Sequence, residues 1–275
     1  MSTPPTNNTP TNILTIKTNQ INLFKTLITA CKYTLGETNI TFTKQGMRIT
    51  QLDSTQTILT DVKLPADRFT DYDCCENKIT ICVDMSLLYN LIKSTNNDDT
   101  LTIYIESSDY PNNIVSHLSL KIENPITAHC NILKLCLNKV YYEDDIRELE
   151  YFNVITLPSD NFKKIITDLS YISDQVTIQI DNKNEKLIYQ CDGDFVSSTI
   201  ECEKSDYLKL KNSNSNSSQL VSGTFNLDKL NLLYEFVKLS ADIELCLEQD
   251  YPLCLKYRCD LGEINLYFAP NSNDE

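Results

Sequence analysis

Residues able to perform acid–base or metal chemistry are scarce in this chain. Its 275 residues include two histidines, His117 and His129, and no Cys-x-x-Cys spacing that would indicate a zinc site. The five glycines form neither of the glycine-rich patterns that bind phosphates. Nucleophilic side chains have no histidine partner at a recognisable spacing. The sequence therefore predicts a protein that is not an enzyme and that holds no metal and no cofactor.

Lysine is the side chain whose placement indicates a function. The chain carries 24 basic and 38 acidic residues, and this net charge of -14 argues against nucleic-acid binding over the whole surface. Lysines nevertheless occupy exposed positions in all four segments of helical pattern, whereas Asp84, Asp160 and Asp228 lie at helix starts. These lysines are Lys25, Lys32, Lys93, Lys163, Lys164 and Lys238. They could face a polyanion, or they could be ordinary solvated residues.

The segment 157–180 shows how a helix would position such lysines. At 100° per residue, Phe162, Ile166 and Leu169 fall on one arc, and Lys164 lies at the centre of the other. Pro158 and Ser159 favour a helix start, and residues 175–180 then alternate like a strand. We expect an amphipathic helix that leads directly into a sheet.

Three further segments, 20–35, 84–94 and 226–240, have the same helical pattern. Alternating runs predict strands at 40–43, 47–52, 58–64, 78–83, 101–106, 115–123, 128–137, 186–191, 195–203, 207–210, 243–247, 253–259 and 263–268. The order helix, strands, helix, strands thus occurs twice, which indicates two copies of one β-rich unit and an α+β fold.

The composition along the chain predicts its domain boundaries. Residues 1–12 are polar and interrupted by prolines, as in a disordered leader, and the acidic stretch 136–150 separates a first domain (13–135) from a second (151–270). Residues 271–275 form an acidic tail. Eleven cysteines in no paired framework, and the lack of a signal peptide or an apolar run of about 18 residues, predict an intracellular, reducing setting.

Four segments resemble the proliferating cell nuclear antigen family, the sliding clamps of eukaryotes and archaea. They are 51–56 (QLDSTQ), 69–93 (FTDYDCCENKITICVDMSLLYNLIK), 157–178 (LPSDNFKKIITDLSYISDQVTI) and 252–270 (PLCLKYRCDLGEINLYFAP). The most specific parts are Leu-Asp-Ser at 52–54, Asp-Leu-Ser at 168–170 and Ala-Pro at 269–270. The match runs in the same order from about residue 14 to the C-terminus.

The resemblance implies a DNA-clamp fold, in which two similar domains each contribute two helices to the lining of a closed ring. Such a ring, usually a homotrimer, encircles double-stranded DNA without reading its sequence and has no catalytic activity. It tethers DNA polymerase, the clamp loader and repair proteins that carry a Gln-x-x-aliphatic-x-x-aromatic-aromatic peptide. We would expect such a ring in the nucleus or in a viral or cytoplasmic DNA replication compartment, and not bound to a membrane.

The resemblance also implies positions for the DNA contacts and the subunit contacts. The DNA-binding residues would be Lys25, Lys32, Lys93, Lys163, Lys164, Lys229 and Lys238. Asn90, Thr167 and Asn231 stand where the family often has a cation, which predicts a weaker lining. The subunit interface would pair Cys130, Ile132 and Lys134 of one copy with Val196, Ser198 and Ile200 of the next, because a ring covers edges that would otherwise aggregate.

The partner groove implied by the resemblance draws on distant parts of the chain. It would be formed by Leu52, Gln56, Val140, Ile146, Pro252, Tyr267, Phe268, Ala269 and Pro270. Gln56 stands where the family usually has a histidine. The acidic connector replaces a Leu-Gly-Ile-Pro-like run, and in it only Ile146 and either Val140 or Leu149 could wall a pocket, so the preferred peptide could differ from that of the family.

Three alternatives stay open from the sequence. The chain could be one subunit of a hetero-oligomeric checkpoint-type clamp, or a monomeric processivity factor bound to a single polymerase. The third alternative is a hydrolase that acts through Cys, Asp or Glu.

Overall fold

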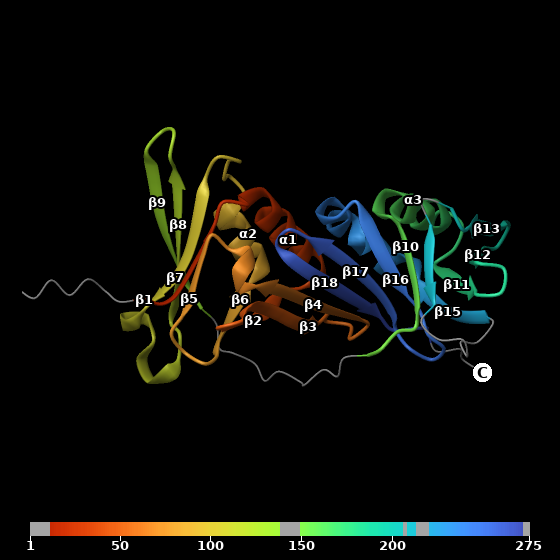
Figure 1. Cartoon of the computed structure of the whole chain (residues 1–275), viewed down its shortest axis with the longest axis horizontal. Coiled ribbons are helices and arrows are strands. Elements are labelled where there is room, and N and C mark those ends of the chain that lie inside the picture. The colour runs from red at the N-terminus through yellow and green to blue at the C-terminus, as the bar shows by residue number, and fades with distance from the viewer. Residues whose placement is uncertain (1–11, 138–148, 206–207, 213–219, 272–275) are drawn as a thin grey trace, which may run out of the picture. The chain divides into compact units, whose positions relative to one another are not determined.

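The computed structural model describes residues 12–137, 149–205, 208–212 and 220–271 (Figure 1). Most of the predicted leader (1–12), connector (136–150) and tail (271–275) lies outside these residues, namely 1–11, 138–148 and 272–275. Contacts divide the chain into two compact units. Among the described residues, the first unit contains 12–25, 37–49 and 63–137, and the second contains 26–36, 50–62 and the part from 149 onward.

The described elements before residue 138 are mainly strands. In chain order they are β1 (Asn12–Thr18), α1 (Ile21–Thr34), β2 (Glu37–Thr43), β3 (Gly46–Leu52), β4 (Ile58–Pro65), η1 (Ala66–Arg68), β5 (Asp71–Cys74), β6 (Ile79–Asp84), α2 (Met85–Ile92), β7 (Thr100–Glu106), η2 (Ser107–Asp109), η3 (Pro111–Asn113), β8 (His117–Asn124) and β9 (His129–Cys136).

The described elements after residue 148 follow the same order of strand, helix, five strands, helix and three strands. They are β10 (Asn153–Pro158), α3 (Ser159–Ser170), β11 (Gln175–Asp181), β12 (Lys186–Asp192), β13 (Ser197–Glu203), β14 (Lys209–Asn212), β15 (Leu220–Asn226), α4 (Leu227–Asn231), η4 (Leu232–Leu239), β16 (Asp242–Cys246), β17 (Leu253–Cys259) and β18 (Gly262–Phe268). The predicted repeat of element order and the α+β class are confirmed.

A five-stranded antiparallel sheet forms much of the first unit, in the order β5-β1-β7-β8-β9. Alternating burial along β7 identifies the face of this sheet that packs in the core. Leu101, Ile103 and Ile105 are buried, and the residues between them are half-buried. The hairpin of β8 and β9 leaves β9 at the end of the sheet (Figure 1). In the same unit β3, β2 and β6 are neighbours.

The second unit holds a four-stranded antiparallel sheet in the order β13-β12-β11-β15. Another run of neighbours, β14-β10-β16-β17-β18-β4, brings the C-terminal strand β18 beside β4. Phe162 of α3 packs on Tyr189 of β12, with 6.4 Å between the ring centroids. This contact fixes the inner face of α3 and leaves its lysine face outward.

The starts of α2 and α3 agree with the sequence. Asp84 caps α2 as predicted, since its carboxylate accepts hydrogen bonds from the N–H groups of Ser86 (2.8 Å) and Leu87 (3.1 Å). At α3 the helix starts where Pro158 and Ser159 predict it: Pro158 is the N-cap residue, and Ser159 is the first helical residue, buried and bonded through its N–H to the Ala241 carbonyl (2.8 Å).

The prediction of one α-helix over 226–240 is wrong in its second half. Only α4 is α-helical, and it is followed by the 3₁₀ helix η4. In η4 the buried residues Leu233, Phe236 and Leu239 recur every third position. A turn of three residues places all of them on one face, which explains the tighter helix.

Candidate DNA-facing and partner-binding surfaces

The lysines of α1 and α2 lie on partly exposed helix faces. Lys25 donates a hydrogen bond from Nζ to the Thr95 carbonyl (2.8 Å), two residues after Lys93, so the first unit brings these two lysines to one end of α2. Lys93 itself caps the C-terminus of α2 and bonds the Asn90 side chain at 3.1 Å. In the second unit, the Nζ of Lys32 lies 4.8 Å from the ring centroid of the exposed Tyr33.

Two lysines from different helices meet at one tyrosine in the second unit. The Nζ of Lys163, on α3, lies 3.6 Å from the ring centroid of Tyr234, and that of Lys238 lies 5.1 Å from it. Lys238 also bonds the Glu235 carboxylate at 2.7 Å, and this bond raises the pKa of its ammonium. Lys164 is exposed on the outer face of α3, as the helical pattern predicts.

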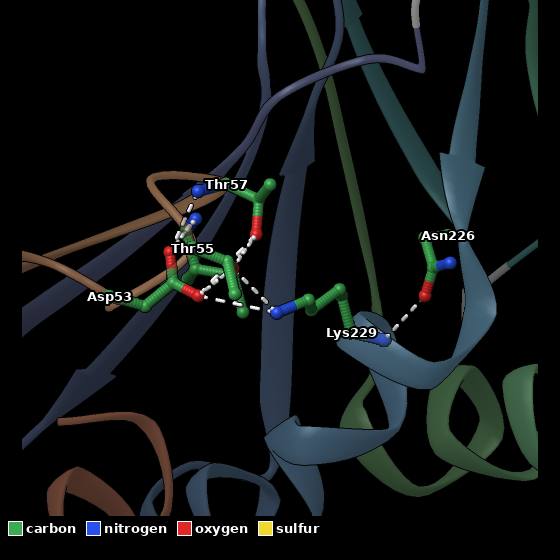
Figure 2. A network of polar contacts seen from close by, with 6 residues as sticks. Asp53, Thr55, Thr57, Asn226 and Lys229 are labelled. Atoms are coloured by element: carbon green, nitrogen blue, oxygen red, sulfur yellow. Dashed lines mark hydrogen bonds and ion pairs between the residues drawn. The ribbon is translucent and has the colours of Figure 1, made fainter.

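Lys229 occupies a different environment from the other predicted DNA contacts (Figure 2). Its Nζ lies 3.3 Å from Oδ2 of Asp53 and donates a hydrogen bond to the Thr55 hydroxyl at 2.7 Å. Asn226 caps α4 by accepting the Lys229 N–H at 3.0 Å, which holds the lysine in place. The ammonium of Lys229 is therefore paired with Asp53 at this turn, whereas the other lysines of the predicted set lie on helix faces.

Asp53 is the centre of this turn. Its carboxylate accepts hydrogen bonds from the Thr57 N–H (2.7 Å), the Ile58 N–H (2.8 Å) and the Thr55 hydroxyl. Burial by itself would raise the pKa of Asp53, but the hydrogen bonds from Thr55, Ile58, Thr57 and Lys229 together lower it to about 2. The Leu-Asp-Ser motif thus owes its structure to a buried carboxylate.

An apolar cavity of about 190 Å³ lies beside this turn. Its lining consists of Leu52, Gln56, Thr57, Leu59, Leu149, Pro252, Tyr267 and Ala269. The structure therefore brings together five predicted groove residues, Leu52, Gln56, Pro252, Tyr267 and Ala269. Val140 and Ile146 lie outside the described residues.

Phe268 and Pro270 do not line this apolar cavity. Side chains alternate along β18, so Tyr267 faces the cavity while Phe268 is buried (2% exposed). The sequence prediction omitted Thr57 and Leu59, and it gave Leu149 only as an alternative to Val140. Leu59 could have been found, because Ile58, Thr60 and Val62 are the inward series of β4 and Leu59 is an apolar residue on the opposite face.

The loop that carries Pro252 is held by the start of the second half of the chain. The Tyr151 hydroxyl donates to the Pro252 carbonyl at 2.7 Å, and its ring meets that of Tyr251 edge to face at 5.9 Å. Glu248 accepts the N–H groups of Phe152 (2.6 Å) and Asn153 (2.8 Å). These contacts hold in place the loop that contains Pro252, one of the residues that line the cavity.

The two predicted subunit contacts are at ends of sheets. Among the described strands, β9 pairs only with β8, and β13 pairs only with β12. On β9, Cys130 and Ile132 are exposed, and Lys134 pairs with the buried Asp109 at 2.8 Å. Val196 is exposed just before β13, whereas Ser198 and Ile200 within β13 are half-buried.

Comparison with known proteins identifies the family of the chain. The model of the proliferating cell nuclear antigen N-terminal domain matches residues 13–140, and that of its C-terminal domain matches residues 145–272. The chain belongs to the proliferating cell nuclear antigen family. The resemblance found in the sequence is thereby confirmed, and the two β-rich halves are the two domains of this family's clamp fold.

Relatives of the family align over nearly the whole chain. Proliferating cell nuclear antigen of Chaetomium thermophilum is 27% identical over 267 residues, 96% of this chain and 100% of the relative. The protein of the same name from Saccharomyces cerevisiae is 25% identical over 270 residues, with 96% and 100% covered. A probable DNA polymerase sliding clamp of Paramecium bursaria Chlorella virus 1 is 26% identical over 258 residues, 93% of this chain and 95% of that protein.

Two negative findings apply to the described residues. Within them no three or more His, Cys, Asp or Glu side chains are grouped so that they could hold a metal ion. Over the same ranges, no helix is long and apolar enough to cross a membrane.

Proposed function

We propose that this chain is a DNA sliding clamp, a processivity factor that encircles duplex DNA and tethers replication and repair proteins to it. The observation that carries the proposal is the match of both family domains, in order, to residues 13–140 and 145–272. The viral relative named a probable DNA polymerase sliding clamp supports the same function. A clamp of this kind acts by topological linkage rather than by catalysis.

The DNA-facing surface consists of the lysines on the helices. Lys25, Lys32, Lys93, Lys163, Lys164 and Lys238 remain in this set. Lys229 leaves it, because its ammonium is bonded to Asp53 and Thr55. Phosphate contacts by lysine carry no sequence information and weaken with salt, which suits a protein that must slide.

The ring is a homo-oligomer, with three copies, in which β9 of one copy pairs with β13 of the next. Both strands end a sheet among the described residues. Ile132 on β9 is 60% exposed, and Val196, just before β13, is 56% exposed. Pairing the two strands satisfies backbone groups that otherwise bond only to water.

The apolar cavity receives an aromatic side chain of a partner peptide, such as that of a DNA polymerase or a clamp loader. A cavity of about 190 Å³ with walls of Leu52, Leu59, Pro252 and Tyr267 can enclose such a ring and remove it from water.

Threading on DNA ends tests the encircling mechanism without any partner protein. Duplex DNA is fixed to beads at one end, micromolar protein is added, and the free end is then blocked with a bulky adduct or left open. A ring stays on the blocked DNA through a high-salt wash and slides off the open DNA. Equal retention on both, or on neither, would contradict a clamp that encircles DNA.

A further inference from the structure

A second cavity adjoins the apolar one and has a different chemical character. It has a volume of about 170 Å³ and is lined by Thr57, Asn226, Lys229, Phe268, Ala269, Pro270 and Asn271. Thr57 and Ala269 line both cavities, and the Ala269 N–H donates to the Thr57 carbonyl at 3.0 Å. One short peptide lying across this pair of residues would therefore reach both cavities.

Lys229 supplies a positive charge to the second cavity. A lysine ammonium has three N–H donors, and the bonds to Asp53 and Thr55 use two of them. The Asp53 carboxylate is 8% exposed and is held by the Thr57 and Ile58 N–H groups, whereas the Lys229 side chain is 29% exposed. The cation is thus the more accessible member of the pair.

The rest of the lining also favours an acceptor. The Oδ1 atom of Asn226 accepts the Lys229 N–H, so the donating Nδ2 of that amide is left for a ligand (Figure 2). The residues that line the cavity include no Asp and no Glu. A carboxylate entering it would meet donors and the Lys229 cation. The Asp53 carboxylate lies 3.3 Å from that cation and offsets part of its charge, but Asp53 also accepts hydrogen bonds from the Thr57 and Ile58 N–H groups.

We propose that this cavity binds a carboxylate side chain, Glu or Asp, of the same partner peptide whose aromatic residue occupies the apolar cavity. The inference rests on the proposed function, because the aromatic residue anchors the peptide. Lys229 then determines which peptides bind, and it does so from the partner groove rather than from the DNA-facing surface. A neutral amide can also accept from Lys229, but hydrogen bonds that involve two charged groups are stronger.

Fluorescent peptides measure this preference. In one series a single glutamate is moved, one position at a time, through the residues that precede an aromatic pair, and a second series carries glutamine instead. Binding to the full chain is followed by fluorescence anisotropy. We expect one position at which glutamate binds about five- to ten-fold more tightly than glutamine, with the difference decreasing as salt is added.

Variants connect the preference to Lys229. Lys229→Met should bind the glutamate and glutamine peptides equally, and Lys229→Arg should keep the preference. Lys183→Met is the matched control, because it removes the same charge from an exposed position outside the helices that does not line the cavity. Tyr267→Ala should weaken both series, since it removes a wall of the apolar cavity.

The outcomes separate the two proposals. Equal affinity for glutamate and glutamine at every position in the unaltered chain would overturn the carboxylate site and leave the groove intact. Failure of every aromatic peptide to bind the unaltered chain, or binding that Tyr267→Ala leaves unchanged, would instead overturn the groove. If Lys229→Met does not fold, Lys229→Arg and the unaltered chain still decide the question.

Discussion

At the scale of single residues, tertiary contacts divide lysines that look alike in the sequence. Lys164 and Lys229 both follow the start of a helical segment, yet Lys164 is exposed on α3 and Lys229 closes the turn at Asp53. The acidic partner of Lys229 lies 176 residues earlier in the chain. A helical pattern cannot reveal such a partner, because periodicity reports only which face a residue occupies.

The buried carboxylate of Asp53 leads to a prediction about stability. Its pKa falls from 3.8 to about 2 in the folded chain, so its contribution is fully present above pH 3.8 and is lost as the pH falls toward 2. Asp53→Asn should therefore lower the free energy of unfolding by about 1–2 kcal/mol at pH 7. Urea unfolding of both proteins at pH 7 and pH 3 measures this.

The same experiment contains its own control. At pH 3 the difference between Asp53→Asn and the unaltered chain should be clearly smaller than at pH 7. An equal difference at both pH values would show that the carboxylate charge does not stabilise the turn. Asp228→Asn is a matched control, since that aspartate is exposed at the start of α4 and should change stability by less than about 0.5 kcal/mol.

At the scale of elements, the helices carry a charge that differs in sign from that of the whole chain. Changing Lys25, Lys93, Lys164 and Lys238 to Glu should greatly weaken binding to a short DNA duplex, because several phosphate contacts are lost at once. The slope of log affinity against log salt should also fall, by up to about 0.9 for each contact removed. Fluorescence anisotropy at several salt concentrations measures both quantities.

A second set of four lysines controls for net charge. Lys44, Lys78, Lys183 and Lys209 are exposed and lie outside the four helices. Their change to Glu alters the total charge by the same amount and should affect DNA binding only slightly. If both sets weaken binding equally, the helices are not the DNA-facing surface. Light scattering should confirm that each variant keeps the mass of the parent.

At the scale of the whole molecule, the edge strands determine whether the chain can form a ring. Light scattering of the purified chain should give the mass of a trimer rather than the 31.5 kDa of one chain. Ile132→Glu should shift the mass to that of a monomer, because it places a charge on β9 where the next copy would pack. Ile126→Glu is the matched control, since Ile126 is also exposed but lies before β9 starts.

The measured mass also decides between the alternatives. A monomer at micromolar concentration would remove the homotrimer and favour a monomeric processivity factor or a subunit of a hetero-oligomeric clamp. A trimer that Ile132→Glu leaves intact would instead move the subunit interface away from β9.

Much of the fold was predictable, because the sequence contains strong local patterns. The helices at 20–35, 84–94 and 157–170 and most strands appear where periodicity indicates them. The strands β1, β5, β10 and β15 were not predicted. In β15 only Val221 and Phe225 are buried, and Gly223 has no side chain at the position between them, so its pattern is weak. Pairing with β11 over the whole strand stabilises β15 instead.

By itself, the sequence determined the order of elements, the repeat and the family, since each depends on local pattern or on matching residues. It also named five residues of the apolar cavity through the family resemblance. Only the tertiary structure decided that Leu59 joins them, that Phe268 does not line this cavity, and that Lys229 is bonded to Asp53 and lines the adjoining cavity. These outcomes depend on which strands become neighbours, and β18 meets β4 across about 200 residues of chain.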